Sequence, residues 1–83
     1  MLLTIRLFAR LREIAGTPDL LLTLPDGATV RTAWNELAAR HAELGEYERT
    51  VSCAVNEEYA RMDAKLKDGD EVAFLPPVSG GGW

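Results

Sequence analysis

The sequence contains a single cysteine, Cys53, so no disulfide can form within the chain. It also lacks a basic cluster, because its nine lysine and arginine residues are scattered among thirteen acidic ones, and the net charge is -4. Proteins that bind DNA or RNA usually carry a basic stripe. Nucleic-acid binding is therefore not expected.

Long apolar runs are absent as well. The first eleven residues alternate between apolar and polar side chains, and Thr4, Arg6 and Arg10 interrupt them. Such a segment is neither a secretory signal nor a membrane span, so no membrane partner is expected and the cytoplasm is the expected location. The acidic pairs Glu57-Glu58 and Asp68/Asp70 lack the spacing of a calcium loop, so no metal site is expected.

What the sequence does contain is a regular succession of strand and helix patterns. The clearest is a helix with Thr29 as its N-cap and Gly45 as the C-cap glycine. Its apolar face is formed by Val30, Ala33, Trp34, Leu37, Ala38 and His41. Alternation predicts strands over residues 3–9, 20–24, 51–55 and 71–75, with a short helical turn over 11–16 and a short extended piece over 59–61.

One amphipathic helix and four or five strands predict a two-layer α+β domain, with the helix on one face of the sheet. The other face should meet solvent and be mostly polar, with exceptions in the first and last strands. Phe8 is expected on that outer face, and the last strand has apolar residues on both faces. An apolar outer face is typical of a protein-binding surface, although scattered exposed apolar residues are also common. Trp34 and Cys53 are predicted to be core residues, and His41 a helix-end residue rather than a general base.

The C-terminal residues differ in composition from the rest of the chain. They run Pro76-Pro77-Val78-Ser79-Gly80-Gly81-Gly82-Trp83. Because glycine lacks a Cβ, such a segment can pass where no other residue fits. We expect a domain over residues 1–77 and a flexible tail over 78–83 that carries the glycines. The tail is either presented to another protein or is simply a disordered end.

Three stretches of the sequence resemble one family, the small subunit of molybdopterin synthase. They are residues 68–81, which end in Pro-Pro-Val-Ser-Gly-Gly, residues 5–16 and residues 54–56. The resemblance implies a ubiquitin-like β-grasp fold with a mixed sheet. It also implies a sulfur carrier for molybdenum cofactor biosynthesis.

In that family an E1-like enzyme uses ATP to adenylate the terminal glycine carboxylate. Sulfur then replaces the adenylate and gives a thiocarboxylate. The large subunit of molybdopterin synthase receives the tail, and the sulfur builds the dithiolene. The resemblance therefore implies that this chain binds no cofactor of its own. It would be a sulfur-donor subunit of a transferase complex, without catalytic activity alone.

The resemblance places the modified residue at Gly81, with Gly80, Ser79 and Val78 as the slender segment before it. Because Gly82 and Trp83 follow, a protease is expected to trim the chain after Gly81, or after Gly82 in an alternative register. The residues proposed to dock on a partner are Phe8, Phe74 and Pro76. Three alternatives stay open: a carrier for tRNA or thiamine thiolation, a ubiquitin-like protein modifier, and a non-transferring interaction domain.

Overall fold

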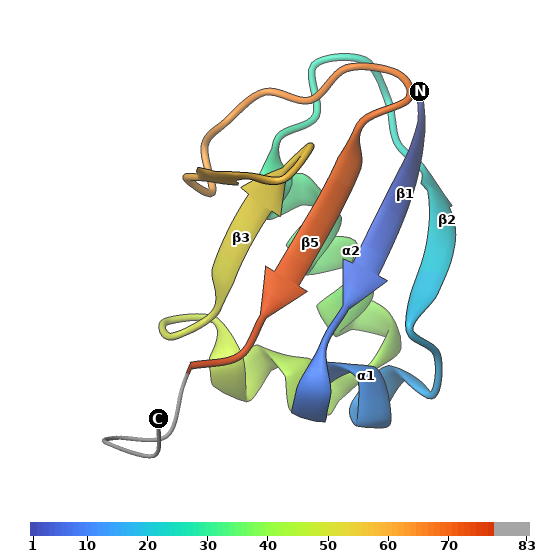
Figure 1. Ribbon diagram of the computed structural model, residues 1–83. Helices are drawn as coiled ribbons and strands as arrows, with labels where there is room; N and C mark the ends of the chain where they lie inside the picture. Colours follow the sequence, from blue (N-terminus) through green and yellow to red (C-terminus); the bar gives the residue numbers. More distant parts are fainter. Residues whose placement is uncertain (78–83) are drawn as a thin grey trace.

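The computed structural model describes residues 1–77. Their order along the chain is β1 (Leu2–Leu7), α1 (Ala9–Ala15), β2 (Asp19–Thr23), α2 (Val30–Arg40), the 3-10 helix η1 (Ala42–Tyr47), β3 (Ser52–Val55), β4 (Glu58–Ala60) and β5 (Glu71–Leu75). Figure 1 shows α2 behind the sheet and α1 at one end of it. The predicted two-layer α+β arrangement is confirmed.

The strands form one five-stranded sheet in the order β2-β1-β5-β3-β4. β1 and β5 are parallel, whereas β1–β2, β3–β5 and β3–β4 are antiparallel. The last strand therefore lies in the middle of the sheet (Figure 1). As a result, Pro76 and Pro77 leave the sheet at its centre, at the end where β1 also finishes and α1 begins.

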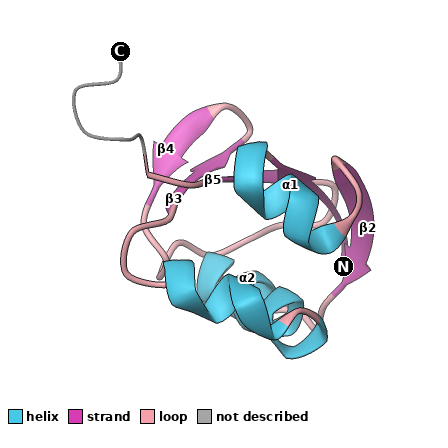
Figure 2. Cartoon of the chain, turned by 90° about the horizontal axis from the view of Figure 1, so that it is seen from below, coloured by secondary structure: helices cyan, strands magenta, loops and turns pink. Residues whose placement is uncertain are grey.

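The core lies between the sheet and the helices, which occupy the same side of it in Figure 2. Trp34 of α2 and Phe74 of β5 are both fully buried, and their ring centroids lie 5.0 Å apart at an angle of 56°. Such a tilted pair adds a directional contact to the burial of both rings. Other fully buried side chains around this pair are Leu3, Ile5, Leu11, Val30, Ala33, Leu37, Leu44 and Val72.

The start of α2 was predicted correctly, but its end was not. Thr29 is the N-cap and forms a capping box with Thr32, in which each threonine hydroxyl accepts a hydrogen bond from the other residue's backbone N–H. The helix ends with His41 as the C-cap, and Gly45 lies inside η1. The chain continues into this tighter helix because it brings Leu44 into the core.

Two strand predictions were displaced by residues with positive φ. β1 ends at Leu7 rather than Ala9, because Phe8 caps α1 and Ala9 has a φ of 51° that turns the chain out of the sheet. Asn56 and Glu57 have φ values of 51° and 70° and form the two-residue turn of the β3–β4 hairpin. β4 accordingly starts at Glu58, one residue before the predicted piece. No helix within residues 1–77 is long and apolar enough to cross a membrane.

Candidate functional site

The open face of the sheet carries the candidate site. No helix among the described residues covers this face, which is turned toward the viewer in Figure 1. Side chains alternate between the two faces of a strand. In β5, Val72 and Phe74 are buried beneath α2, whereas Ala73 and Leu75 are only partly buried and lie on the open face. The prediction that β5 has apolar residues on both faces is confirmed.

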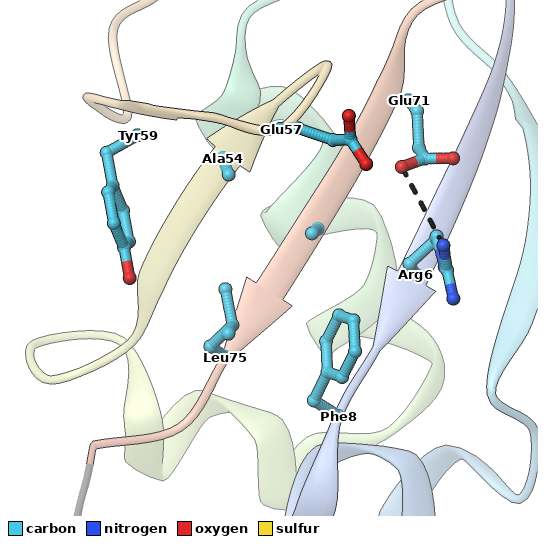
Figure 3. Close-up of a pocket in the computed structure, with 8 residues that line it drawn as sticks. Arg6, Phe8, Ala54, Glu57, Tyr59, Glu71 and Leu75 are labelled. Atoms are coloured by element: carbon cyan, nitrogen blue, oxygen red, sulfur yellow. Dashed lines mark ion pairs between the residues drawn. The ribbon is translucent and has the colours of Figure 1, made fainter.

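A hollow of about 240 Å³ lies on this face. It is lined by Arg6, Phe8, Ala54, Glu57, Tyr59, Glu71, Ala73 and Leu75 (Figure 3). Ala54 and Ala73 are register partners on β3 and β5, so two small side chains form the floor. Phe8 and Tyr59 stand on opposite sides, with Leu75 between them at the end of β5 (Figure 3). Tyr59 is 82% exposed and Phe8 is 36% exposed, so both rings are accessible to a partner.

Arg6 carries the positive charge of the hollow. Its guanidinium Nη1 lies 4.0 Å from Oε1 of Glu71, and its Cζ lies 5.7 Å from the centroid of the Phe8 ring. The ion pair is roughly half exposed, and such pairs contribute little to stability. The Arg6 guanidinium can therefore exchange Glu71 for another acidic group at small cost.

Asn56 fixes the β3–β4 hairpin to the start of β5. Its backbone N–H donates to the carbonyl of Glu71 at 2.8 Å, and its Nδ2 donates to Oδ1 of Asp70 at 2.9 Å. Its Oδ1 accepts from the N–H of Glu71 at 3.0 Å. These bonds hold the hairpin that bears Glu57 and Tyr59 beside the hollow. Sequence reasoning did not identify Asn56 as the residue that fixes this hairpin, although asparagine is one of the few residues that tolerate positive φ.

The three predicted docking residues lie in three different environments. Phe8 lines the hollow, and Pro76 is half-buried directly after β5. The prediction of Phe74 as a docking residue is wrong. Its side chain is fully buried against Trp34, because strand alternation places it on the helix-covered face while Leu75 takes the open one. The predicted tail residues Val78, Ser79, Gly80, Gly81, Gly82 and Trp83 lie outside the described residues.

The interpretation of Cys53 as a core residue is confirmed. Its side chain is buried, and its Sγ donates a hydrogen bond to the carbonyl of Ala60 at 3.0 Å. Burial raises the pKa of the Cys53 thiol, which keeps it protonated and unreactive. His41 is the C-cap of α2, as expected for a helix-end histidine. Among the described residues, no three His, Cys, Asp or Glu side chains gather where they could hold a metal ion.

Comparison with known proteins settles which family has this arrangement. The profile of the ThiS family matches residues 5–81, which is nearly the whole chain. The chain belongs to the ThiS family. A molybdopterin synthase sulfur carrier subunit from Arabidopsis thaliana is 44% identical over 75 residues, covering 90% of this chain and 78% of the relative. The resemblance to the molybdopterin synthase small subunit is thereby confirmed.

Two solved structures extend the comparison. The crystal structure of SAMP1 from Haloferax volcanii superposes with a TM-score of 0.83 at 31% identity, covering 98% of this chain and 100% of that one. The crystal structure of the Amycolatopsis orientalis BexX/CysO complex contains a chain with a TM-score of 0.73 at 27% identity, covering 95% of this chain and 99% of that one. The expected ubiquitin-like β-grasp fold is confirmed by these likenesses and by the strand order.

Proposed function

We propose that this chain is the sulfur carrier subunit of molybdopterin synthase and carries sulfur as a thiocarboxylate on Gly81. The observation that supports the proposal most directly is the family match. It runs through residue 81, the second glycine of Pro-Pro-Val-Ser-Gly-Gly, and the Arabidopsis relative bears the name of this carrier. The rest of the chain then serves as a scaffold that presents one carboxylate.

A carboxylate needs activation before it can receive sulfur. Its negative charge repels nucleophiles, and oxide is a poor leaving group. An E1-like partner would supply ATP, so that a Gly81 carboxylate oxygen attacks the α-phosphate and pyrophosphate leaves. A sulfur nucleophile then attacks the acyl carbon and AMP departs, leaving the thiocarboxylate. In this proposal ATP binds the partner, and this chain contributes only the acyl group.

The scaffold has two parts with different tasks. The hollow on the open sheet face would dock on the large subunit of molybdopterin synthase, through Phe8, Leu75 and Arg6. The residues from Val78 to Gly81 would cover at most roughly 13–14 Å when extended, which is enough to enter a neighbouring active site. The BexX/CysO complex supports this division, because there a chain of the same fold is bound to a second protein.

The proposal requires a free carboxylate on Gly81. Gly82 and Trp83 follow in the sequence, so a protease must remove them before activation. Cleavage after Gly82 would give an alternative terminus one residue longer. A terminal tryptophan side chain is far bulkier than glycine and would not fit a narrow channel shaped for a glycine backbone.

The test is the intact mass of the chain purified from its native host. We expect a species that ends at Gly81, together with a second species heavier by the difference between sulfur and oxygen. A Gly81→Ala variant should keep the fold, as seen by circular dichroism, and lose most sulfur transfer, because its methyl group crowds the approach. Detection of only the full-length chain in cells that make molybdopterin would contradict the proposal.

A second function is favoured by one specific observation, the likeness to SAMP1. That protein is a small archaeal modifier by name, and its fold superposes over nearly the whole of this chain. A modifier would join Gly81 to lysine side chains through isopeptide bonds. Immunoblots of host lysates would then show a ladder of heavier species that a Gly81-deleted variant does not form.

A further inference from the structure

β2 presents an unpaired edge with a regular hydrogen-bonding pattern. It is the outermost strand on one side of the sheet, and no described element lies beyond it (Figures 1 and 2). Met1 and Leu24 exchange two backbone hydrogen bonds, at 2.7 and 2.9 Å. By the register of β1 and β2, the next hydrogen-bonded pairs are Leu3 with Leu22 and Ile5 with Leu20. In an antiparallel ladder, hydrogen-bonded and non-hydrogen-bonded pairs alternate.

The backbone groups of the intervening residues therefore point away from β1. These residues are Asp19, Leu21 and Thr23, and all three are exposed. The bond from the hydroxyl of Thr17 to the Asp19 carbonyl, at 2.7 Å, confirms that this carbonyl faces outward. A carbonyl oxygen has two lone pairs, so it can still accept a second hydrogen bond. The edge thus offers three consecutive sites for pairing with another strand.

We propose that two copies of this chain pair through β2 in an antiparallel, two-fold arrangement centred on Leu21. In this register, Leu21 faces the partner's Leu21, and Asp19 faces the partner's Thr23 at each end. Each of these pairs exchanges two backbone hydrogen bonds. The two five-stranded sheets then become one continuous sheet.

A second copy fits this edge because the strand is complementary to itself. Its only charged residue, Asp19, lies opposite a threonine and not opposite another acid. The central side chain, Leu21, is 65% exposed and would be covered by its symmetry mate. Natural edge strands are usually protected by lysine, proline or a bulge, and residues 19–23 contain neither lysine nor proline. The opposite edge, β4, is only three residues long.

This pairing leaves the open face available. The two-fold axis at a hydrogen-bonded antiparallel pair is perpendicular to the sheet, so both open faces lie on the same side. The hollow lies toward β3 and β4, on the other side of β1 from the paired edge. The pairing therefore does not cover the hollow of either copy.

Engineered disulfides test the register in the full-length chain. Facing Cα atoms in a hydrogen-bonded pair lie about 5.5 Å apart, within the range of a disulfide. Leu21→Cys alone should form a covalent dimer under mild oxidation. Thr23→Cys alone should not, because the two Thr23 Cα atoms would lie about 14 Å apart, four residues along the strands and one strand across. Mixing Asp19→Cys with Thr23→Cys should give the heterodimer. Buried Cys53 should stay reduced in all of them.

A second measurement tests the pairing without cysteines. Leu21→Pro removes the two central N–H donors, and β1 does not use the Leu21 N–H, so the variant should keep its fold by circular dichroism. Sedimentation velocity at increasing concentration should show a dimer for the natural chain and an affinity weakened about tenfold or more in the variant. A natural chain that stays monomeric at millimolar concentration would overturn the proposal. So would a dimer that Leu21→Pro leaves unchanged, or equal cross-linking of Thr23→Cys alone.

Discussion

At the scale of single residues, Asn56 combines two properties that no other side chain supplies at that position. Its backbone has a φ of 51°, which glycine and asparagine adopt at low cost. Its side chain bonds both to the carboxylate of Asp70 and to the backbone N–H of Glu71. The hairpin that carries Tyr59 therefore depends on the conformational tolerance and on the hydrogen bonds together.

Substitution of Asn56 should separate these two contributions. Asn56→Ala loses both side-chain hydrogen bonds and adds backbone strain, so the free energy of unfolding should fall by about 2–3 kcal/mol. Asn56→Gly keeps the positive φ without strain, so its free energy of unfolding should fall by only about 1 kcal/mol. Urea denaturation measures both. Equal losses in the two variants would show that the strain contributes nothing.

Cys53 should make stability depend on pH in the alkaline range. Burial raises the pKa of its thiol above the ordinary value of 9.0, so the folded state holds the proton more tightly than the unfolded state. Its contribution is fully present below the unfolded pKa and is lost as the pH rises through the folded pKa. Urea denaturation from about pH 7 to about pH 10 should show a steeper alkaline loss for the natural chain than for Cys53→Ala. Parallel curves would contradict this.

At the scale of elements, α2 depends on its first turn for a defined start. The hydroxyl of Thr29 accepts from the N–H of Thr32, and that of Thr32 accepts from the N–H of Thr29. Two N–H groups that would otherwise lack partners are thereby satisfied. This start sets the register in which Val30, Ala33, Trp34 and Leu37 face the sheet.

Removing the cap should weaken α2 without changing the sheet. Thr29→Ala should lower the free energy of unfolding by about 1 kcal/mol, whereas Thr29→Ser should keep most of the stability. Thermal denaturation followed by circular dichroism at 222 nm (a helix signal) measures the difference. If serine were as damaging as alanine, the methyl group of Thr29 rather than its hydroxyl would be the stabilising group.

Elements were predictable where local pattern and tertiary packing agree. α2 and β5 show a clear period and clear boundary residues, so the sequence placed Thr29 and the limits of β5 correctly. Gly45 was misplaced as a C-cap because the tertiary gain from burying Leu44 extends the chain into η1. The hollow could not be predicted as a whole, because Ala54, Ala73 and Tyr59 meet only through the β3–β5 and β3–β4 pairings. Phe74 was misassigned because both faces of β5 are apolar.

At the scale of the whole molecule, the two phenylalanines have opposite roles. Phe74 is fully buried in the core, and Phe8 is exposed beside the hollow. A chain of 83 residues has a thin core, so the loss of one large buried ring removes a large share of its stability. If Phe8 docks on the partner as proposed, docking and stability can therefore be varied independently in this small domain.

The pair Phe8→Ala and Phe74→Ala tests this separation. Phe74→Ala should lower the free energy of unfolding by about 3–5 kcal/mol, whereas Phe8→Ala should change it by less than about 1 kcal/mol. Calorimetric titration against the purified large subunit should show binding weakened about tenfold or more by Phe8→Ala. Unchanged binding by a folded Phe8→Ala variant would place the docking surface elsewhere.

The central position of β5 also bears on the order of events during synthesis. β1 is made first and β5 last, yet these two strands lie side by side. Until the final strand leaves the ribosome, β1 has no central neighbour, β3 and β4 have no sheet to join, and the hollow has no floor. The hollow is consequently complete only at the very end of translation. Under the proposed function, an incomplete chain therefore lacks the surface that would dock on a partner.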